Sequence, residues 1–341
     1  MKKIKVLLTG ASGTVGYQAL LQLVAQEELF KITVFDMDTP QSRTLLEPFR
    51  DRVRLVYGDI TQPNHSVEAC RGVDYVIHLA SLIPPMADEN QVLAHRVNVE
   101  GTRNLISNLE RYSPDVFVVY SSSVSVYGDR VETPEIRVSD PLKPSDRDYY
   151  ATTKIAAEEI LRSSRLRWSI FRLSAIIGAQ NHKISPLMFH MPLNTPIEMT
   201  SPEDTARAFV HAAQHREELE GKIFNLGGGE QNRIHFRDLL VNNFRLFGLG
   251  KFNLPEKAFA EKNFHCGYYA DGDDLERIVH FRQDTLATYW QKVKESVPRW
   301  RYFLTRLVAP LIKKILLFRS EPWQAYQTGN KKEMKHYFRS F

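Results

Sequence analysis

The sequence predicts an α/β protein with a doubly wound parallel sheet and a smaller, mostly helical domain after it. Short apolar runs alternate with longer segments in which apolar residues recur every three or four positions. Strands that alternate with helices indicate a parallel sheet covered on both faces. A glycine-rich turn follows the first run, and the alternation stops near residue 175. The expected strands cover residues 5–8, 32–35, 53–57, 75–79, 116–120, 169–173 and 223–226, and the clearest expected helices cover 15–26, 92–109 and 203–215.

Length and composition are typical of a globular protein with more than one domain. The chain has 341 residues, of which 43% are hydrophobic and 25% are charged. Its two cysteines, Cys70 and Cys266, are too few for a disulfide framework and favour a reducing, cytoplasmic location. Residues 1–8 resemble a signal peptide only in having two lysines before a short apolar run, and we expect them to form the first strand.

Positive charge is concentrated near the C-terminal end. The net charge is +5, but residues 290–341 hold 12 Lys or Arg against 3 Asp or Glu, so the rest of the chain is mildly acidic. A nucleic-acid-binding protein needs a basic face on its folded body, and the sequence gives no sign of one. We therefore expect a small-molecule substrate and no nucleic acid.

A glycine-rich turn between the first strand and the first helix is the first candidate site. Its spacing lets the backbone approach a pyrophosphate, which would sit on the N–H groups at the start of the helix. Asp36 ends the second strand, where a carboxylate accepts hydrogen bonds from the adenosine ribose and repels a 2′-phosphate. This favours NAD over NADP, although Arg43 lies nearby and a plain surface aspartate is the alternative. The expected contacts are Gly10, Ser12, Gly13, Thr14, Val15, Gly16 and Asp36.

A tyrosine and a lysine four residues apart form the second candidate site. With 14 tyrosines in the chain, a Tyr-x-x-x-Lys pair is expected about once by chance, so its place after the fifth strand carries the argument. Residues four apart share a helix face, so the Lys154 ammonium can lie beside the Tyr150 phenol. The ordinary pKa of a phenol, about 10, is too high for a base at neutral pH, and a neighbouring cation lowers it. Tyr149 is a rival, but its spacing to the lysine is wrong.

These segments together resemble the extended short-chain dehydrogenase/reductase family, also called the NAD-dependent epimerase/dehydratase family. The resemblance covers about residues 4–230 and includes a His-Leu-Ala-Ser stretch from His78 and an Asn-Val-Glu-Gly-Thr stretch from Asn98. It implies a Rossmann fold, a homodimer, and catalysis by Ser123 with Tyr150 and Lys154. The further cofactor contacts that it implies are Asp59, Ile60, Leu79, Ala80, Ser81, Asn98, Ser121, Tyr150 and Lys154.

Other reactive-looking residues favour structural roles. His211 and His215 are four apart on an expected helix, as zinc ligands can be, but no HExxH or CxxC motif accompanies them. Cys266, beside His265, is interpreted as a small buried residue rather than a nucleophile. We expect no metal site.

The segment after the sixth strand bears on the substrate. Family members that act on nucleotide sugars usually carry Arg-x-x-Asn-x-Tyr-Gly-Pro there, and the Asn helps to seat the diphosphate. Here Ala175, Ile177 and Ala179 stand at the Asn, Tyr and Pro positions. The lost amide and the gained aliphatic surface favour an apolar alcohol or ketone, as in the 3β-hydroxysteroid dehydrogenase branch. The alternatives are a nucleotide-sugar epimerase or dehydratase that does not consume NAD, and an NAD-binding redox sensor, against which the intact Tyr–Lys pair argues.

We expect three parts in the chain. Residues 1–175 and 200–228 form the NAD-binding domain, 176–199 and 229–298 the substrate domain, and 299–341 a basic amphipathic tail in which Pro310 kinks or splits a helix. An apolar stripe on this helix, opposite three basic residues, fits either peripheral contact with an anionic membrane through 299–319 or docking on the protein's own core or a partner subunit, which we prefer. The stripe is Trp300, Leu304, Leu307, Leu311, Ile315 and Phe318, and the basic residues are Arg299, Arg306 and Lys313.

Overall fold

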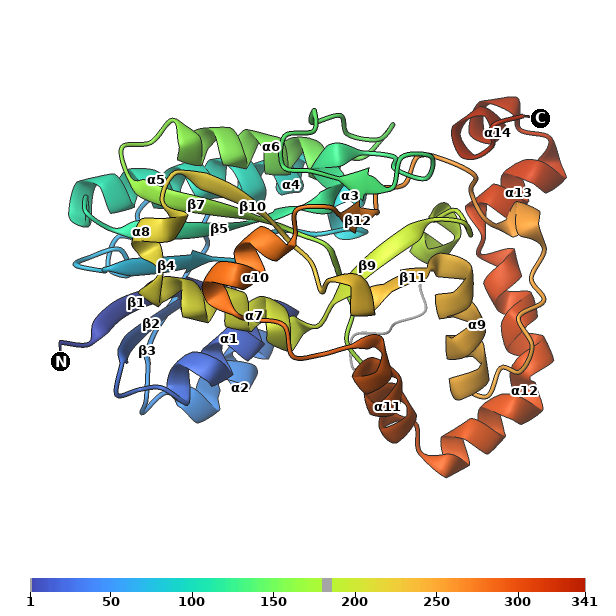
Figure 1. The fold of residues 1–341 in the computed structure, drawn as a ribbon, viewed down its shortest axis with the longest axis horizontal. Helices are drawn as coiled ribbons and strands as arrows, with labels where there is room; N and C mark the ends of the chain where they lie inside the picture. The colour runs from blue at the N-terminus through green and yellow to red at the C-terminus, as the bar shows by residue number, and fades with distance from the viewer. Residues whose placement is uncertain (1, 180–185, 341) are drawn as a thin grey trace.

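A seven-stranded parallel sheet forms the centre of the computed structural model, which describes residues 2–179 and 186–340 (Figure 1). The strand order is β10-β7-β5-β4-β1-β2-β3, and every neighbouring pair is parallel, which confirms the predicted fold class. The chain reverses its direction of winding between β1 and β4, and ligands bind beyond the carboxyl ends of strands at such a point. The strands are β1 (Ile4–Thr9), β2 (Phe30–Asp36), β3 (Arg54–Tyr57), β4 (Tyr75–His78), β5 (Phe117–Ser123), β7 (Arg167–Leu173) and β10 (Lys222–Leu226).

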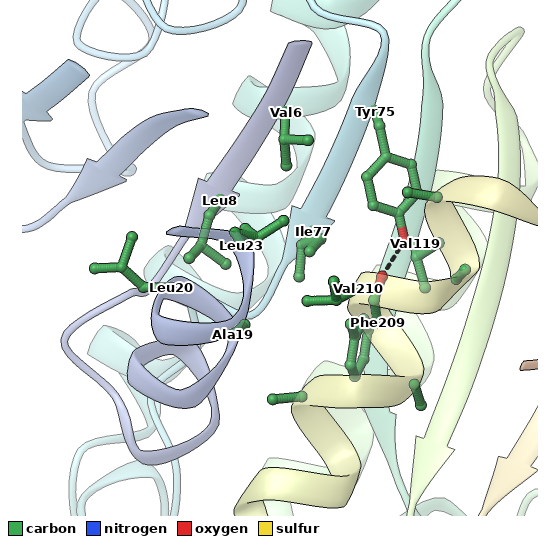
Figure 2. Packing of buried hydrophobic residues seen from close by; sticks show 14 of the residues in the cluster. Val6, Leu8, Ala19, Leu20, Leu23, Tyr75, Ile77, Val119, Phe209 and Val210 are labelled. Carbon is green, nitrogen blue, oxygen red and sulfur yellow. Dashed lines mark hydrogen bonds between the residues drawn. The ribbon is translucent and has the colours of Figure 1, made fainter. Parts of the chain in front are cut away.

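Helices cover both faces of this sheet because its strands are apolar on both sides. On one face, α1 and α7 pack together over a core that includes Val6 and Leu8 of β1 (Figure 2). Tyr75 lies in this core, and its hydroxyl donates to the Phe209 carbonyl at 2.6 Å, so the buried polar atom is satisfied. On the other face, α5 and α6 close a second core. The helices are α1 (Thr14–Val24), α2 (Pro40–Leu46), α3 (Met86–Glu89), α4 (Gln91–His95), α5 (Gly101–Tyr112), α6 (Tyr149–Arg162), α7 (Pro202–His211), α8 (Arg216–Leu219) and α10 (Asp273–Val279).

The second region has its own core and two small sheets. One sheet has the order β11-β9-β8 and the other pairs β12 with β6. Side chains of α9, α11 and α12 pack around the aromatic rings of Phe189 and Phe259. Figure 1 shows α12, α13 and α14 along the edge of the molecule that lies away from the N-terminus. The elements are β6 (Glu135–Ile136), β8 (Ala175–Ile176), β9 (Pro196–Thr200), β11 (Arg233–His235), β12 (Tyr268–Tyr269), α9 (Phe236–Leu246), α11 (Leu286–Ser296), α12 (Arg299–Phe318), α13 (Glu321–Thr328) and α14 (Lys331–Tyr337).

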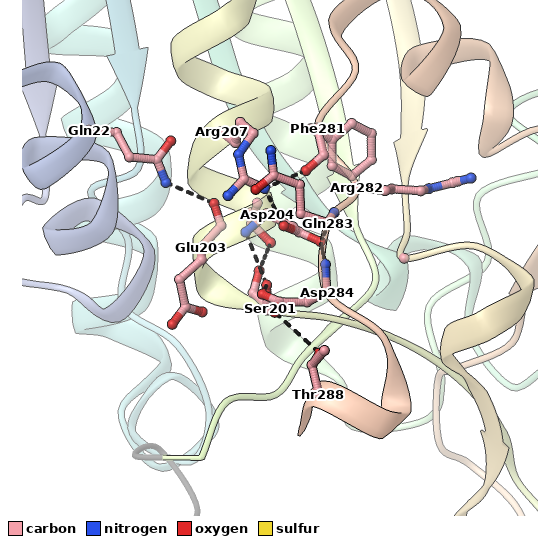
Figure 3. A network of polar contacts seen from close by, with 12 residues as sticks. Gln22, Ser201, Glu203, Asp204, Arg207, Phe281, Arg282, Gln283, Asp284 and Thr288 are labelled. Carbon is pink, nitrogen blue, oxygen red and sulfur yellow. Dashed lines mark hydrogen bonds and ion pairs between the residues drawn. The ribbon is translucent and has the colours of Figure 1, made fainter. Parts of the chain in front are cut away.

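A polar network joins the two regions at the start of α7 (Figure 3). The Asp204 carboxylate, only 1% exposed, accepts hydrogen bonds from the backbone N–H groups of Gln283 and Asp284, both at 2.9 Å. The Asp284 carboxylate accepts a bond from the Ser201 hydroxyl at 2.6 Å, and Arg207 pairs with Asp204. The chain between α10 and α11 is therefore tied to the sheet-forming region.

Two expected helices end or break at places that the apolar pattern did not show. The helix expected at 92–109 consists of α4, a π-helical turn (Arg96–Glu100) and α5. The helix expected at 203–215 ends at His211, where α7 gives way to a 3₁₀ turn (Ala212–Gln214). Residues 180–185 of the expected substrate domain lie outside the described residues.

The tail helix α12 corrects two expectations. It continues through Pro310, so of the two outcomes expected there, a kink or a split, the split is wrong; Pro310 is exposed, and water can bond the carbonyl that its missing N–H leaves without a donor. The predicted apolar stripe does not dock on the protein's own core. Ala309 and Leu316, on the opposite face, are buried there instead. Within residues 2–179 and 186–340, no helix is both long enough and apolar enough to cross a membrane.

Candidate active site

The glycine-rich turn lies at the carboxyl edge of the sheet, between β1 and α1. Gly10 has φ +76°, and a Cβ at this position would lie 2.8 Å from the backbone nitrogen of Ala80. A Cβ on Gly16 would lie 2.0 Å from the Gly10 carbonyl oxygen. Both positions therefore need glycine. Gly13 stands at the N-cap of α1 and contributes no capping side chain, so the turn fits a pyrophosphate on the first N–H groups of the helix.

Asp36 ends β2, and its carboxylate is tied to the glycine turn. It accepts hydrogen bonds from the Ser12 N–H at 2.7 Å, the Ser12 hydroxyl at 2.8 Å and the Met37 N–H at 2.8 Å. An ionised carboxylate has about four acceptor positions, so one is left for a ribose hydroxyl. Arg43, the neighbouring cation, is held elsewhere by a two-point ion pair with Asp38, at 2.6 and 3.0 Å.

The other residues assigned to the cofactor lie at or against the same edge. The Ala80 N–H donates to the Thr9 hydroxyl at 3.2 Å, which joins the ends of β4 and β1. Asn98 is 1% exposed, and its amide clamps the loop after β4 by accepting from the Leu82 N–H at 2.7 Å and donating to the Leu82 carbonyl at 2.9 Å. Its contact with a cofactor, and those of the other residues, stay predictions. Among the assigned residues, Gly10, Ser12, Gly13, Thr14, Val15 and Gly16 lie between β1 and α1 or at the start of α1, Asp36 ends β2, Asp59 and Ile60 follow β3, Leu79, Ala80 and Ser81 follow β4, Asn98 lies in the π-helical turn, and Ser121 lies in β5.

Ser123, Tyr150 and Lys154 lie together where β5 ends and α6 begins. Asp148 caps α6 by accepting from the Ala151 N–H at 2.9 Å. The side chains of Ser123 and Ser81 lie near the Tyr150 hydroxyl and favour its ionised form. The Lys154 ammonium lies 5.6 Å from the centre of the Tyr150 ring. The sequence assigned Ser81 to the cofactor only, because no pattern showed that the loop after β4 reaches the phenol.

Burial dominates the protonation of this cluster. It raises the pKa of Tyr150 above the ordinary range of a phenol, and the neighbouring side chains of Ser123 and Ser81 oppose this increase. Burial also lowers the pKa of Lys154 to about 7, opposed by the charge of Glu158. The sequence led us to expect the Lys154 ammonium beside the phenol, where a cation lowers the pKa of that phenol. In the structure this ammonium donates to the carbonyl at the end of β5, that of Ser121, at 2.8 Å.

A buried ion pair one helical turn beyond Lys154 was missed in the sequence. Glu158 is 2% exposed, and its carboxylate accepts two hydrogen bonds from Arg172, at 3.0 and 2.8 Å, and one from the Ser122 hydroxyl. Ser122 stands between the Ser121 carbonyl that receives the lysine and the Ser123 side chain. The pair therefore fixes the end of β5 behind the reacting groups. The spacing of Tyr150, Lys154 and Glu158, four and four along one helix face, was the available signal.

Two cavities bear on the site, although Ser123, Tyr150 and Lys154 line neither of them. The first, of about 700 Å³, runs from the glycine turn at Gly13 and Thr14 to the aliphatic side chains of Ile177, Ala179 and Met199. We call it the cofactor cleft because Ser12, Gly13 and Thr14 of the glycine turn line it.

The second cavity, of about 620 Å³, lies between the loop after β4, the residues before α6, and the last two helices. We call it the charged cavity, because three His–carboxylate pairs lie in its wall. Two of these pairs include residues of α13 and α14, so the end of the chain completes the wall and is no separate appendage. The pairs are His265 with Asp148 at 2.9 Å, His190 with Glu321 at 3.1 Å, and His336 with Asp146 at 2.9 Å.

The remaining reactive-looking residues do not form a further site. His211 hydrogen-bonds with the Val279 carbonyl at 2.7 Å and His215 with Glu218 at 2.9 Å, so the two imidazoles have separate partners. In the part of the chain that the structure describes, no group of three His, Cys, Asp or Glu side chains could hold a metal ion. Cys266 is buried in the second region, which confirms its interpretation, and burial raises its pKa to about 12.

The fold and the site are those of a dinucleotide-binding protein. The sequence profile of the NAD dependent epimerase/dehydratase family matches residues 6–227, and the chain belongs to that family. Human 3 beta-hydroxysteroid dehydrogenase type 7 is 31% identical over 161 residues, which are 46% of this chain and 43% of that protein. Human sterol-4-alpha-carboxylate 3-dehydrogenase, decarboxylating, is 25% identical over 244 residues, which are 65% of this chain and 61% of that protein. The chain thus spans less than two thirds of either relative.

Solved structures share the fold over most of the chain. The dTDP-glucose 4,6-dehydratase DesIV from Streptomyces venezuelae, with NAD bound, has a TM-score of 0.71 and 22% identity, and covers 86% of this chain and 98% of its own. A short-chain dehydrogenase/reductase superfamily protein from Agrobacterium tumefaciens, also with bound NAD, has a TM-score of 0.65 and 21% identity, and covers 90% of this chain and 99% of its own.

Proposed function

We propose that this protein is an NAD-dependent oxidoreductase that transfers a hydride between the nicotinamide and the hydroxyl or carbonyl carbon of an apolar alcohol or ketone. One observation carries the proposal: the Tyr150 hydroxyl meets Ser123 and Ser81 at the carboxyl end of β5, beside a glycine turn shaped for a dinucleotide. The same grouping argues against a sensor that binds NAD without catalysis, because binding alone needs no buried phenol.

Each of the three residues Ser123, Tyr150 and Lys154 would have a separate role in proton transfer. When bound, NAD supplies the ring that accepts or donates the hydride. Ser123 would hold the substrate oxygen and align it with the Tyr150 hydroxyl. Tyr150 would take the hydroxyl proton during oxidation and return it during reduction. Because burial raises the pKa of this phenol, its ionised form needs a cation nearby, and a protonated Lys154 supplies one.

The surroundings of Asp36 support NAD rather than NADP. A 2′-phosphate at the ribose would meet a carboxylate that is buried and fixed by Ser12. Arg43, the cation that could have balanced such a phosphate, is already paired with Asp38.

An apolar substrate is supported by the wall of the cofactor cleft. Ile177 and Ala179, which stand at the Tyr and Pro positions of the nucleotide-sugar segment, line it together with Met199. The names of two curated relatives refer to hydroxysteroid and sterol substrates.

A nucleotide-sugar epimerase or dehydratase is the second candidate, and the charged cavity favours it. Side chains such as Arg147, Lys262 and His265 in its wall suit a polar ligand better than a sterol. In this reaction the hydride returns to the same molecule and NAD is not consumed. Solved structures with the same fold include a UDP-glucuronic acid 4-epimerase from Bacillus cereus in complex with UDP-glucuronic acid and NAD.

Net formation of NADH separates the two candidates. The purified chain is incubated with NAD and a panel of sterol and terpenoid alcohols, and in parallel its melting temperature is followed with UDP- and dTDP-sugars. The proposal expects absorbance of NADH with at least one apolar alcohol. Turnover of nucleotide sugars alone, without net NADH, would replace it with the second candidate.

Homodimerisation, a cytoplasmic location and the predicted domain limits stay predictions of the sequence. Light scattering of the purified chain tests the first. Limited proteolysis tests the limits, with cuts expected near residues 175–200 and 228.

A further inference from the structure

One helix carries a concentration of exposed apolar side chains. Of the 15 large apolar residues that are exposed in the described chain, seven lie on α12. They recur every three or four residues, so they form one stripe about 27 Å long. Folded proteins rarely leave such a patch uncovered, and a partner or a membrane is the usual reason. The seven residues, 47% to 79% exposed, are Trp300, Phe303, Leu304, Leu307, Leu311, Ile315 and Phe318.

The opposite face of α12 holds the helix to the protein. Ala309 and Leu316 are buried in the core of the second region. Lys313 donates to the Lys251 carbonyl at 2.6 Å and to the Asn253 side chain at 2.8 Å. These contacts hold the part of the helix from Ala309 to Leu316 against the protein and leave the stripe and its borders available to a partner.

Basic residues border the stripe, and no acidic residue interrupts it. No Asp or Glu occurs between residues 299 and 320. At 100° per residue, Arg299 and Arg306 fall along one border, Arg301 and Arg319 along the other, and all four are exposed. Lys314 lies within the stripe, where its long stem can cross apolar surface and leave the ammonium among polar groups.

We propose that α12 binds the surface of an anionic lipid bilayer and lies in the plane of the headgroups, with the stripe turned toward the acyl chains. The apolar face would enter the interface while the bordering arginines contact the lipid phosphates and carboxylates. A second copy of the chain fits less well, because pairing two such faces would bring basic borders together with no acidic counterpart. The inference stands on exposure and charge alone and does not rest on the proposed substrate.

Co-sedimentation of the full chain, saturated with NAD, with phospholipid vesicles tests the proposal. We expect binding to vesicles of equal parts phosphatidylcholine and phosphatidylserine, weaker binding to pure phosphatidylcholine, and a loss of binding with added salt. Leu307→Gln with Leu311→Gln should weaken binding about tenfold for each leucine. Arg301→Gln with Arg306→Gln should weaken it about fivefold for each arginine, and only on the anionic vesicles.

Matched controls use exposed residues away from α12. Val92→Gln removes an equally exposed apolar side chain, and Lys294→Gln removes an exposed lysine of α11; both should bind like the unaltered chain. Trp300 is a reporter, because its fluorescence should shift to shorter wavelength on anionic vesicles, and Trp300→Phe should remove the shift while binding remains.

Two results would overturn the proposal. The first is that the unaltered chain does not sediment with anionic vesicles. The second is that sedimentation velocity shows a dimer that Leu307→Gln with Leu311→Gln converts to a monomer, which would assign the stripe to a second copy. Because the salt dependence and the arginine variants leave the apolar stripe intact, the test holds even if the leucine variants fail to fold. Turnover of a water-soluble alcohol is measured beside each binding curve, so a failure of the proposed function remains separate.

Discussion

The cofactor cleft and the charged cavity are built by different kinds of contact. The cleft begins at Ser12, Gly13 and Thr14 of the glycine turn, and the backbone of this turn leaves no room for a Cβ at Gly10 or Gly16. The charged cavity is closed by His–carboxylate pairs whose members are 190, 117 and 131 residues apart in the chain.

This difference predicts how strongly a substitution should affect each site. The backbone of the glycine turn has no space for a side chain at Gly10 or Gly16, so even one added methyl group there should lower stability and NAD binding sharply. The His–carboxylate pairs of the charged cavity are side chains that can rearrange, so removal of a single charge there should change the stability only slightly. The Tyr150 cluster should be more sensitive to substitution than either cavity, because Tyr150 and Lys154 are buried.

Replacement of the phenol hydroxyl should have the largest effect. Tyr150→Phe removes the group that exchanges the proton, and we expect kcat to fall by about 10²- to 10⁴-fold while the Kd for NAD changes little. Steady-state kinetics and NAD titration measure the two quantities. Tyr149→Phe, one residue earlier on the same helix, is the control and should keep most of the activity. Equal losses in both variants would place the chemistry elsewhere.

Loss of the buried carboxylate behind the cluster should come next. Glu158→Gln leaves the charge of Arg172, 3% exposed, without its partner, which is expected to cost about 3–5 kcal/mol of unfolding free energy. Urea denaturation measures this free energy of unfolding. Glu159→Gln, an exposed neighbour, is the control, and removal of both charges by Glu158→Gln with Arg172→Met should recover part of the loss. An unaltered midpoint for Glu158→Gln would show that the ion pair does not hold the end of β5.

The sequence was sufficient for the parts that depend on neighbours along the chain. Apolar runs placed all seven strands of the main sheet, because a strand buried on both faces needs a continuous apolar run. The glycine spacing placed the turn, and the four-residue spacing of Tyr150 and Lys154 placed both on one face of α6.

Contacts between distant segments were not predictable in the same way. Ser81 lies near the Tyr150 hydroxyl and donates to the Asn98 side chain at 3.1 Å, and no local pattern in the sequence encodes this arrangement. The stripe of α12 was visible as a periodicity, but periodicity does not tell which face meets the core. Ala309 and Leu316 meet the core, and the side chains of the stripe remain outside.

A methyl group added to the glycine turn should lower the stability and the affinity for NAD, with a smaller effect than the two changes above. In Gly16→Ala the new Cβ would lie 2.0 Å from the Gly10 carbonyl oxygen, so the turn must shift, at about 1–3 kcal/mol. We expect a lower melting temperature and weaker binding of NAD, measured by differential scanning calorimetry and by fluorescence titration. Gly13→Ala is the matched control, because its Cβ would lie at 3.3 Å from the same oxygen. If the two variants behave alike, the close approach at Gly16 does not define the turn.

The smallest effect should come from a single charge at the charged cavity. Asp88 is half-buried, and burial together with the nearby Asp148 raises its pKa. A carboxyl whose folded-state pKa is raised destabilises the fold once the pH exceeds its unfolded value of about 3.9, where the unfolded chain ionises more readily. Asp88→Asn should therefore raise the melting temperature at pH 7, by at most a few degrees, and the gain should disappear below about pH 4. Asp115→Asn, at an exposed position, is the control and should change nothing at either pH. A lower melting temperature at pH 7 would mean that the ionised carboxylate of Asp88 holds the loop after β4 in place. The charged cavity would then tolerate substitution as poorly as the cofactor cleft.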